Sequence, residues 1–162
     1  MMQRFVTRIL TVASMLLLTA CFEGEKTGPV DIHWDRDVCE LCKMLISDHR
    51  FAAEVRGGEK KKIYKFDDIG CAINWLNDQP WAGDEAAEIW VVEVSSTREE
   101  TVWLNARDAR YVKGKLTPMN YGYSAVAPAK SGEQVGIDFV ELTTKILADT
   151  PNHICIVPER NE

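Results

Sequence analysis

The chain has 162 residues and a formal net charge of −6 at pH 7, a length typical of one domain or of two very small ones. Its acidic balance argues against binding to nucleic acid or to anionic lipid headgroups, because both carry negative charge. Such a surface suits a basic or cationic partner.

The first twenty residues predict export from the cytoplasm. A start that contains Arg4 and Arg8 and no acidic residue is followed by an apolar run from Ile9 to Leu18. That run is much shorter than the ~20 apolar residues of a membrane-spanning helix. A basic start followed by a short apolar run indicates a signal peptide over residues 1–20.

The next residues predict a lipid anchor. Leu18-Thr19-Ala20-Cys21 resembles a lipobox, in which bacterial lipoproteins are acylated on the cysteine and cleaved before it. The alternative is a plain signal peptide with Cys21 there by chance. Acyl chains on Cys21 would hold the protein at a membrane without a spanning helix, and residues 21–37 would be a lipidated tether. We therefore expect the folded part on the periplasmic side. The outer membrane is favoured because Phe22 does not look like an inner-membrane retention signal.

Residues 38–98 show strand and helix patterns in the order strand, strand, helix, strand. The strands are predicted at 51–55, 60–66 and 89–94, with a turn at 56–59 between the first two. The helix is predicted to begin at a capping Asp67 or Asp68 and to end before Pro80. Its apolar face is predicted to consist of Ile69, Ala72, Ile73 and Leu76.

Residues 99–162 repeat this order more faintly. Strands are predicted at 101–104, 124–127 and 154–157, a short helical turn at 106–111, and a helix that begins after Asp138. A shift of 71 positions places Asp67 on Asp138 and Leu76 on Leu147. A chance match of two amphipathic helices is the alternative to an internal repeat. The pattern favours an α+β fold made of two similar small units packed together.

The first candidate site is Cys39-Glu40-Leu41-Cys42-Lys43-Met44. A zinc site would need further ligands, and Cys71 and Cys155 are isolated in the sequence. A thioredoxin-like pair would open a helix, whereas the residues after Met44 look extended. Thiolate and thioether together select Cu(I) over harder ions, and a structural disulfide between Cys39 and Cys42 stays an alternative.

Two further segments carry candidate residues. Met119 lies in a loop between Pro118 and Gly122, where a methionine is placed for contact, although core packing is the commoner role of this residue. Asp67 and Asp68 are expected to act as helix caps favoured by the helix dipole. Cys71 is expected to be an inert buried thiol beside the apolar face.

These motifs, in this order, resemble those of the NosL family of copper-binding lipoproteins. The resemblance rests on the lipobox, the cysteine motif, Phe66-Asp67-Asp68-Ile69-Gly70-Cys71 with Trp75, Trp103-Leu104-Asn105-Ala106, Ala109-Arg110-Tyr111-Val112, and Thr117-Pro118-Met119 with Gly122. The resemblance implies two similar ββαβ units. It also implies a Cu(I) ion that is handed to the machinery assembling the copper-sulfide centre of nitrous oxide reductase.

One departure from the family concerns Lys43. The family usually has Cys-Gly-Met where this chain has Cys42-Lys43-Met44, and lysine adopts a positive φ less readily than glycine. If that backbone angle shapes the site, the ligand geometry of this chain would differ from that of the family.

The resulting hypothesis is a Cu(I) chaperone without enzymatic activity. Cys42, Met44 and Met119 are predicted to bind Cu(I), with Cys39 as a fourth donor or as the disulfide partner of Cys42. The predicted partners are a membrane transporter complex that assembles the copper site, nitrous oxide reductase, and the membrane through the lipid on Cys21, but not nucleic acid. Two other functions stay open: a periplasmic thiol–disulfide oxidoreductase that uses Cys39 and Cys42, and a structural scaffold lipoprotein.

Overall fold

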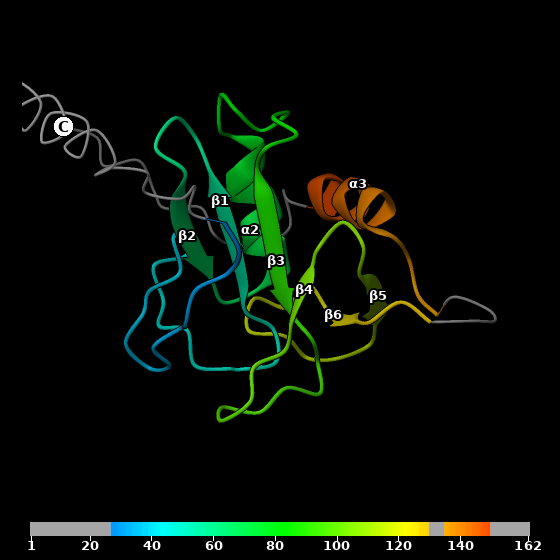
Figure 1. Cartoon of the computed structure of the whole chain (residues 1–162). Coiled ribbons are helices and arrows are strands. Elements are labelled where there is room, and N and C mark those ends of the chain that lie inside the picture. The colour runs from blue at the N-terminus through cyan, green and yellow to red at the C-terminus, as the bar shows by residue number, and fades with distance from the viewer. Residues whose placement is uncertain (1–26, 130–134, 150–162) are drawn as a thin grey trace, which may run out of the picture.

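The protein has an α+β fold, seen in a computed structural model that describes residues 27–129 and 135–149. The strands are β1 (Ala53–Gly57), β2 (Lys62–Phe66), β3 (Glu88–Val92), β4 (Trp103–Asn105), β5 (Arg110–Lys113) and β6 (Tyr123–Val126), and the helices are α2 (Ile69–Asn77) and α3 (Phe139–Asp149). Four strands form an antiparallel sheet in the order β2-β1-β3-β4, and β5 and β6 form a second, two-stranded sheet. Helix α2 lies behind the larger sheet and α3 lies beside α2 (Figure 1).

Strand β1 is the centre of the larger sheet, and all five of its residues are buried. Its alternating side chains point to opposite faces, so both faces must be covered there. Contacts with α2 cover one face. On the other face, the Val30 N–H donates a hydrogen bond to Glu54 Oε2 at 2.9 Å, and the guanidinium of Arg56 donates to the Gly28 carbonyl oxygen. The segment after residue 27 therefore packs on the sheet.

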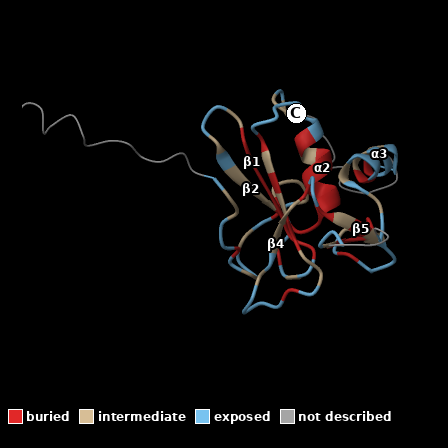
Figure 2. Ribbon diagram, turned by 45° about the vertical axis from the view of Figure 1, so that its right-hand side comes forward, coloured by how far each residue is buried: buried red, intermediate tan, exposed pale blue. Residues whose placement is uncertain are grey.

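Helix α2 forms where the sequence predicts it. Asp68 is the N-cap, and its carboxylate accepts a hydrogen bond from the Gly70 N–H at 3.0 Å. This bond satisfies one of the amide groups that a helix start leaves without a partner. The predicted apolar face is buried (Figure 2), and the helix ends at Asn77, three residues before Pro80.

The second sheet and α3 complete the fold. Tyr111 of β5 is buried, and its ring lies 6.3 Å from that of Phe139 at the start of α3. Helix α3 begins after Asp138, as predicted, and the Asp138 carboxylate accepts a hydrogen bond from the Glu141 N–H. Most of its surface is exposed, with Leu142 and Ile146 buried (Figure 2). One core cluster joins these two residues to the residues under the larger sheet.

The structure supports the predicted fold class but does not confirm the internal repeat. The described elements after residue 98 follow the order β4, β5, β6, α3, and β4 belongs to the larger sheet. The strand predicted at 154–157 lies outside the described residues, as do the predicted signal peptide, the predicted lipidation site at Cys21, and Cys155. The unit boundaries at 38–98 and 99–162 stay predictions.

Two local differences from the sequence predictions are informative. The turn between β1 and β2 lies at residues 58–61, whereas the sequence predicts it at 56–59. Residues 106–108 form a turn within the predicted range 106–111, but residues 110–113 form β5, because Tyr111 and its neighbours pair with β6. Among the described residues, no helix is both long enough and apolar enough to cross a membrane.

Candidate metal centre

The segment from Cys39 to Met44 is a tight turn closed by its own backbone. The Cys39 N–H donates to the Met44 carbonyl oxygen at 2.8 Å, and the Lys43 N–H donates to the Cys39 carbonyl oxygen at 3.0 Å. Lys43 has a φ of 62°, the left-handed conformation that favours glycine. Lysine therefore occupies a backbone conformation that glycine adopts without the steric penalty of a side chain.

This turn is attached to the end of the larger sheet. The Glu40 N–H donates to the Lys65 carbonyl oxygen of β2 at 2.8 Å. Strand β2 ends at Phe66, and Asp67 and Asp68 connect it directly to α2. The turn that contains Cys39 and Cys42 therefore lies against the junction from which α2 begins.

Four potential ligands meet at this junction. One ligand atom from each of Cys39, Cys42, Asp67 and Cys71 lies within 4.8 Å of all the others. The tetrahedral Zn–S bond of about 2.3 Å places sulfur ligands about 3.8 Å apart, so a single ion fits after a small contraction. Cys39, Cys71 and Asp67 are buried, and Cys42 is only partly buried. All three cysteines are free thiols, so the structure does not contain the alternative Cys39–Cys42 disulfide.

The surroundings of Cys42 favour the thiolate form of its side chain. Hydrogen bonds from the Cys39 and Cys71 thiols lower the pKa of Cys42 to about 4. The pKa of Cys71 is raised, because its thiol donates hydrogen bonds to Cys39 and Cys42 and because it is buried. Burial raises the pKa of Asp67 to about 7. Cys42 is therefore the group best prepared to bind a metal at neutral pH, since metals bind the thiolate rather than the thiol.

A second loop, from Thr117 to Gly122, is attached to the start of α2. The Thr117 hydroxyl donates to the Asp68 carboxylate at 2.5 Å, and the Met119 N–H lies 3.4 Å from the same oxygen. The Tyr121 ring packs directly on Gly70, where an added Cβ would lie 2.2 Å from the ring. Two motifs that are far apart in the sequence are therefore held together, with Asp68 and Gly70 on one side and the Met119 loop on the other.

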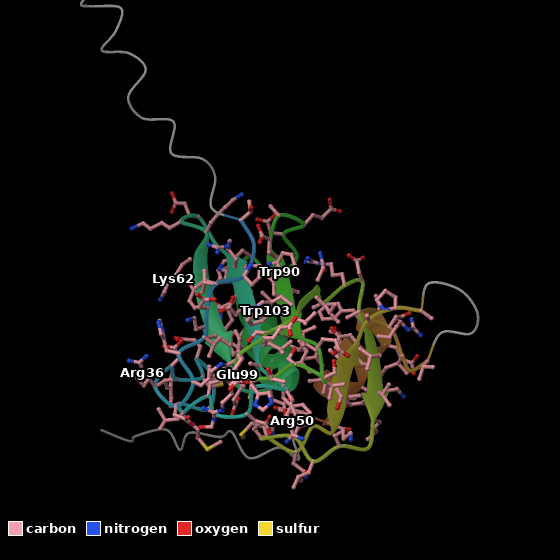
Figure 3. All side chains as sticks on the ribbon, turned by 60° about the horizontal axis from the view of Figure 1, so that its bottom comes forward. Arg36, Arg50, Lys62, Trp90, Glu99 and Trp103 are labelled. Carbon is pink, nitrogen blue, oxygen red and sulfur yellow. The ribbon has the colours of Figure 1, made fainter. Side chains whose placement is uncertain are left out.

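The two segments line one open cavity. Its walls include Met44 from the cysteine turn, Asp67 from the start of α2, and Leu116, Thr117 and Pro118 from the second loop. Met44 is 47% exposed, and Met119 is partly buried against the core. Arg50 also lines this cavity, and Figure 3 labels it at the same end of the molecule as Arg36. The cavity brings together the two segments that contain Met44 and Met119, but its lining includes Met44 and not Met119. Metal binding by either thioether stays a prediction.

Comparison with protein families identifies the chain. The sequence model of the NosL family matches residues 29–134, a range that includes every described residue of the cluster, of the cysteine turn and of the second loop. The chain belongs to the NosL family. No curated protein matches the chain. Membership in NosL supports a copper-related accessory function.

The donors of this NosL protein fit copper through sulfur. Thiolate and thioether are soft ligands that select Cu(I), and the cysteine turn supplies Cys39, Cys42 and Met44 within six residues. The carboxylate of Asp67 is a harder donor, which suits a divalent ion better. The Cys/Asp cluster can therefore hold a metal ion, and its sulfur-rich side agrees with the copper-binding character of NosL.

Sequence reasoning missed two members of the cluster. Cys71 was expected to be an inert core thiol and Asp67 a helix cap, whereas both face Cys39 and Cys42. One signal was available: Asp67 and Cys71 are only four residues apart at the predicted start of a helix, so they lie near one another. The cap itself is Asp68, as one of the two sequence alternatives proposed.

Proposed function

We propose that this NosL protein binds Cu(I) and delivers it for maturation of the copper-sulfide centre of nitrous oxide reductase. Cys42, Met44 and Met119 bind the ion, and Cys39 is a possible fourth donor. The observation that carries the proposal is the shared cavity, because it is lined both by Met44 and by the loop that contains Met119.

The burial of the donors suits a protein that gives its metal away. Cys42 is partly buried and Met44 is 47% exposed, whereas Cys39 is fully buried. Two or three soft donors at a surface leave a coordination position open to a ligand of the receiving protein. Delivery of this kind makes and breaks only metal–ligand bonds, so the proposal includes no enzymatic activity.

The proposed place of work is the periplasmic side of a membrane. Residues 1–20 serve as a signal peptide, lipid on Cys21 anchors the chain, with the outer membrane favoured, and the residues between Cys21 and the segment that packs on the sheet tether the fold. The proposed receiver is a membrane transporter complex that assembles the copper site of nitrous oxide reductase. The net charge of −6 supports a receiver with a basic docking surface.

The test is an anaerobic titration of the reduced chain from Phe22 onward with Cu(I) against a competing chelator. This form keeps every described residue, and the core cluster begins at Ile32. We expect one tightly bound copper per chain. Cys42→Ser and Met119→Leu should each weaken binding at least about tenfold, since even the loss of an outer-shell partner typically costs 10- to 100-fold in metal affinity.

Leu116→Ala provides the matched control for the methionine variant. Leu116 lines the same cavity, is 81% exposed and has no sulfur, so its loss should leave the affinity for Cu(I) unchanged. A titration in which Met119→Leu binds copper as tightly as the unchanged chain would exclude a site shared between the two segments.

A second candidate function is favoured by the electrostatics of Cys42. Its lowered pKa and partial exposure are typical of the attacking thiol of an oxidoreductase, and Cys39 lies beside it as a possible resolving thiol. This function predicts a Cys39–Cys42 disulfide that cycles with a partner and that does not depend on Met44 or Met119. The methionine variants therefore distinguish the two functions.

A further inference from the structure

The described chain enters the fold at the end of the larger sheet that carries the β1–β2 hairpin. The Gly28 N–H donates a hydrogen bond to Glu88 Oε2 at 2.7 Å, and Arg56 Nη2 donates to the Gly28 carbonyl oxygen at 2.7 Å. Arg56 and Glu88 are partners in the pairing of β1 with β3, and Arg56 is 6% exposed. Since β1 ends one residue later, at Gly57, these bonds fix Gly28 beside the hairpin.

The candidate metal centre lies beyond the opposite end of the same sheet. Phe66 at the end of β2 pairs with Ala53 at the start of β1, and Asp67, directly after Phe66, lines the cavity. Figure 3 labels Lys62, at the start of β2, away from Arg50, which also lines the cavity. The five residues of β2 span roughly 14 Å in an extended strand. The chain therefore enters at one end of the sheet and the cavity lies at the other.

The hairpin end carries lysines and a tryptophan, and we call residues 58–62 together with Trp81 the hairpin surface. Lys60 and Lys62 are exposed, and Trp81 is partly buried, with its ring packed on Gly57, where an added Cβ would lie 2.3 Å from the ring. An indole ring combines an apolar body with a polar N–H, and a lysine carries its charge on an apolar stem. Both side chains are therefore suited to the boundary between water and lipid.

We propose that the hairpin surface lies against the bilayer that holds the lipid on Cys21, and that the cavity with Met44 faces away from that bilayer. The proposal rests on the lipid anchor of the proposed function. Gly28 follows Cys21 by seven residues, and an extended chain spans at most about 3.6 Å per residue, so the hairpin end stays within roughly 25 Å of the bilayer. A tether this short holds the surface at an effective concentration in the millimolar range, at which weak contacts are sufficient.

The charges of the hairpin end favour zwitterionic lipids. Glu59, Asp84 and Glu85 are exposed, and the Asp84 N–H donates to the Trp81 carbonyl oxygen at 3.0 Å, which places this acidic residue beside the hairpin surface. A surface of mixed charge gains little from a bilayer with net negative charge, because the carboxylates offset the lysines. The phosphate groups of zwitterionic headgroups can accept hydrogen bonds from the lysines, and their ammonium groups can pair with the carboxylates.

This orientation places the proposed copper donors at the free end of the anchored protein. A receiver would meet Met44 from the aqueous side, without entering the space between the protein and its own membrane. A receiver embedded in the same bilayer would have to extend past the whole sheet to reach the ion.

The test is hydrogen–deuterium exchange of the mature chain lipidated on Cys21, on vesicles of phosphatidylcholine and phosphatidylethanolamine. The comparison is the lipid-free chain from Phe22 onward, mixed with the same vesicles. We expect slower exchange in the lipidated form at residues 58–62 and 82–86, and equal exchange in the two forms at residues 39–44 and 116–120. Slower exchange at the cysteine turn, or equal exchange in the two forms at both ends, would overturn the proposal.

Lysine variants test which side chains make the contact. Lys60→Ser combined with Lys62→Ser should bring the exchange of the hairpin in the lipidated form close to that in the lipid-free form. Lys115→Ser is the matched control, because Lys115 is an exposed lysine next to Leu116, which lines the cavity, and this variant should keep the slower exchange. Slower exchange that is unchanged in the double variant would overturn the hairpin lysines as the contact.

Mass spectrometry of the Cys21 peptide and a Cu(I) titration separate this proposal from the proposed function. A mature chain without lipid on Cys21 would overturn both the anchor and the membrane contact. A lipidated chain that shows slower exchange at the hairpin but binds no Cu(I) would support the membrane contact and refute only copper delivery. A lipidated chain that binds Cu(I) but shows equal exchange in the two forms would refute only the membrane contact.

Discussion

The turn at Cys39–Met44 and the loop at Thr117–Gly122 reach the same cavity, but they are held in place in different ways. The turn is closed by hydrogen bonds between its own backbone groups. The loop is fixed by side-chain contacts with α2, in which Asp68 binds Thr117 and Gly70 receives the Tyr121 ring. The shape of the turn is therefore determined locally, whereas the position of the loop depends on packing against a distant helix.

This difference makes the first turn of α2 the common support of the site. Two of its residues face the cysteines, Asp67 just before the helix and Cys71 inside it. Two others, Asp68 and Gly70, hold the loop that contains Met119. A change on the loop-facing side should therefore move Met119 and leave the cysteine cluster in place.

The largest expected effect comes from Gly70→Ala, which breaks the attachment of the loop. The new Cβ would lie 2.2 Å from the Tyr121 ring, so the loop must move, and overpacking of this kind destabilises by about 1–3 kcal/mol. We expect a lower free energy of unfolding in urea and weaker Cu(I) binding. Gly83→Ala is the matched control, because a Cβ there meets no atom within 4 Å. If the two variants had the same free energy of unfolding and the same Cu(I) affinity, the Tyr121 contact would not position the loop.

A pH-dependent effect on stability, rather than on the copper site, is expected from Glu54→Gln in the sheet that supports the cysteine turn. Burial raises the pKa of Glu54 from 4.5 to about 7. The negative charge of Asp37 also raises this pKa, whereas the positive charges of Lys65 and Arg56 lower it. Between these values the folded chain keeps a proton that the unfolded chain releases. The free energy of unfolding should therefore fall as pH rises from 4.5 to 7 and level off above 7, by about 1.4 kcal/mol for each pKa unit.

Glu54→Gln should flatten that part of the pH profile, measured by urea denaturation of the metal-free chain at several pH values. It should also raise stability at pH 8 relative to the unchanged chain, because glutamine has no charge to bury. Glu59 is exposed, so Glu59→Gln is the control and should retain the slope. If the free energy of unfolding of Glu54→Gln still falls with pH in this range, groups other than Glu54 cause the slope.

The smallest expected effect comes from Lys43→Gly and tests whether the turn is determined locally. Lys43 has a φ of 62°, and glycine adopts this conformation without the steric penalty of a side chain. We expect an increase of about 0.5–1 kcal/mol in the free energy of unfolding and a site of unchanged composition. Glu40→Gly is a control in the same turn, where no positive φ is present, and it should not stabilise the chain. A loss of stability in Lys43→Gly would contradict a strained lysine at this position.

The parts of the fold that the sequence predicts are those determined by nearby residues. The cap at Asp68, the apolar face of α2 and the hairpin strands follow from residue type and spacing within a few positions. The left-handed φ of Lys43 agrees with the glycine that the family usually has at this position. Local geometry of this kind depends little on the rest of the chain.

The parts that were missed depend on contacts between distant residues. Cys71 meets Cys39 only because the cysteine turn is bonded to Lys65 at the end of β2, beside the start of α2. Strand β5 forms because Tyr111 pairs with Ala125 of β6, a pairing that no short-range pattern around residue 110 indicates. Prediction of these contacts requires the register of the sheets, which the sequence pattern does not fix.

The unequal burial of the three thiols has a kinetic consequence. Cys39 and Cys71 are fully buried, and only Cys42 reaches solvent. An incoming ligand from another protein can therefore approach a bound ion only from the side of Cys42, so exchange would begin there and the buried sulfurs would leave last. An ion held on the solvent side would be exchanged rapidly and one held on the buried side slowly, even if both were bound with the same equilibrium affinity.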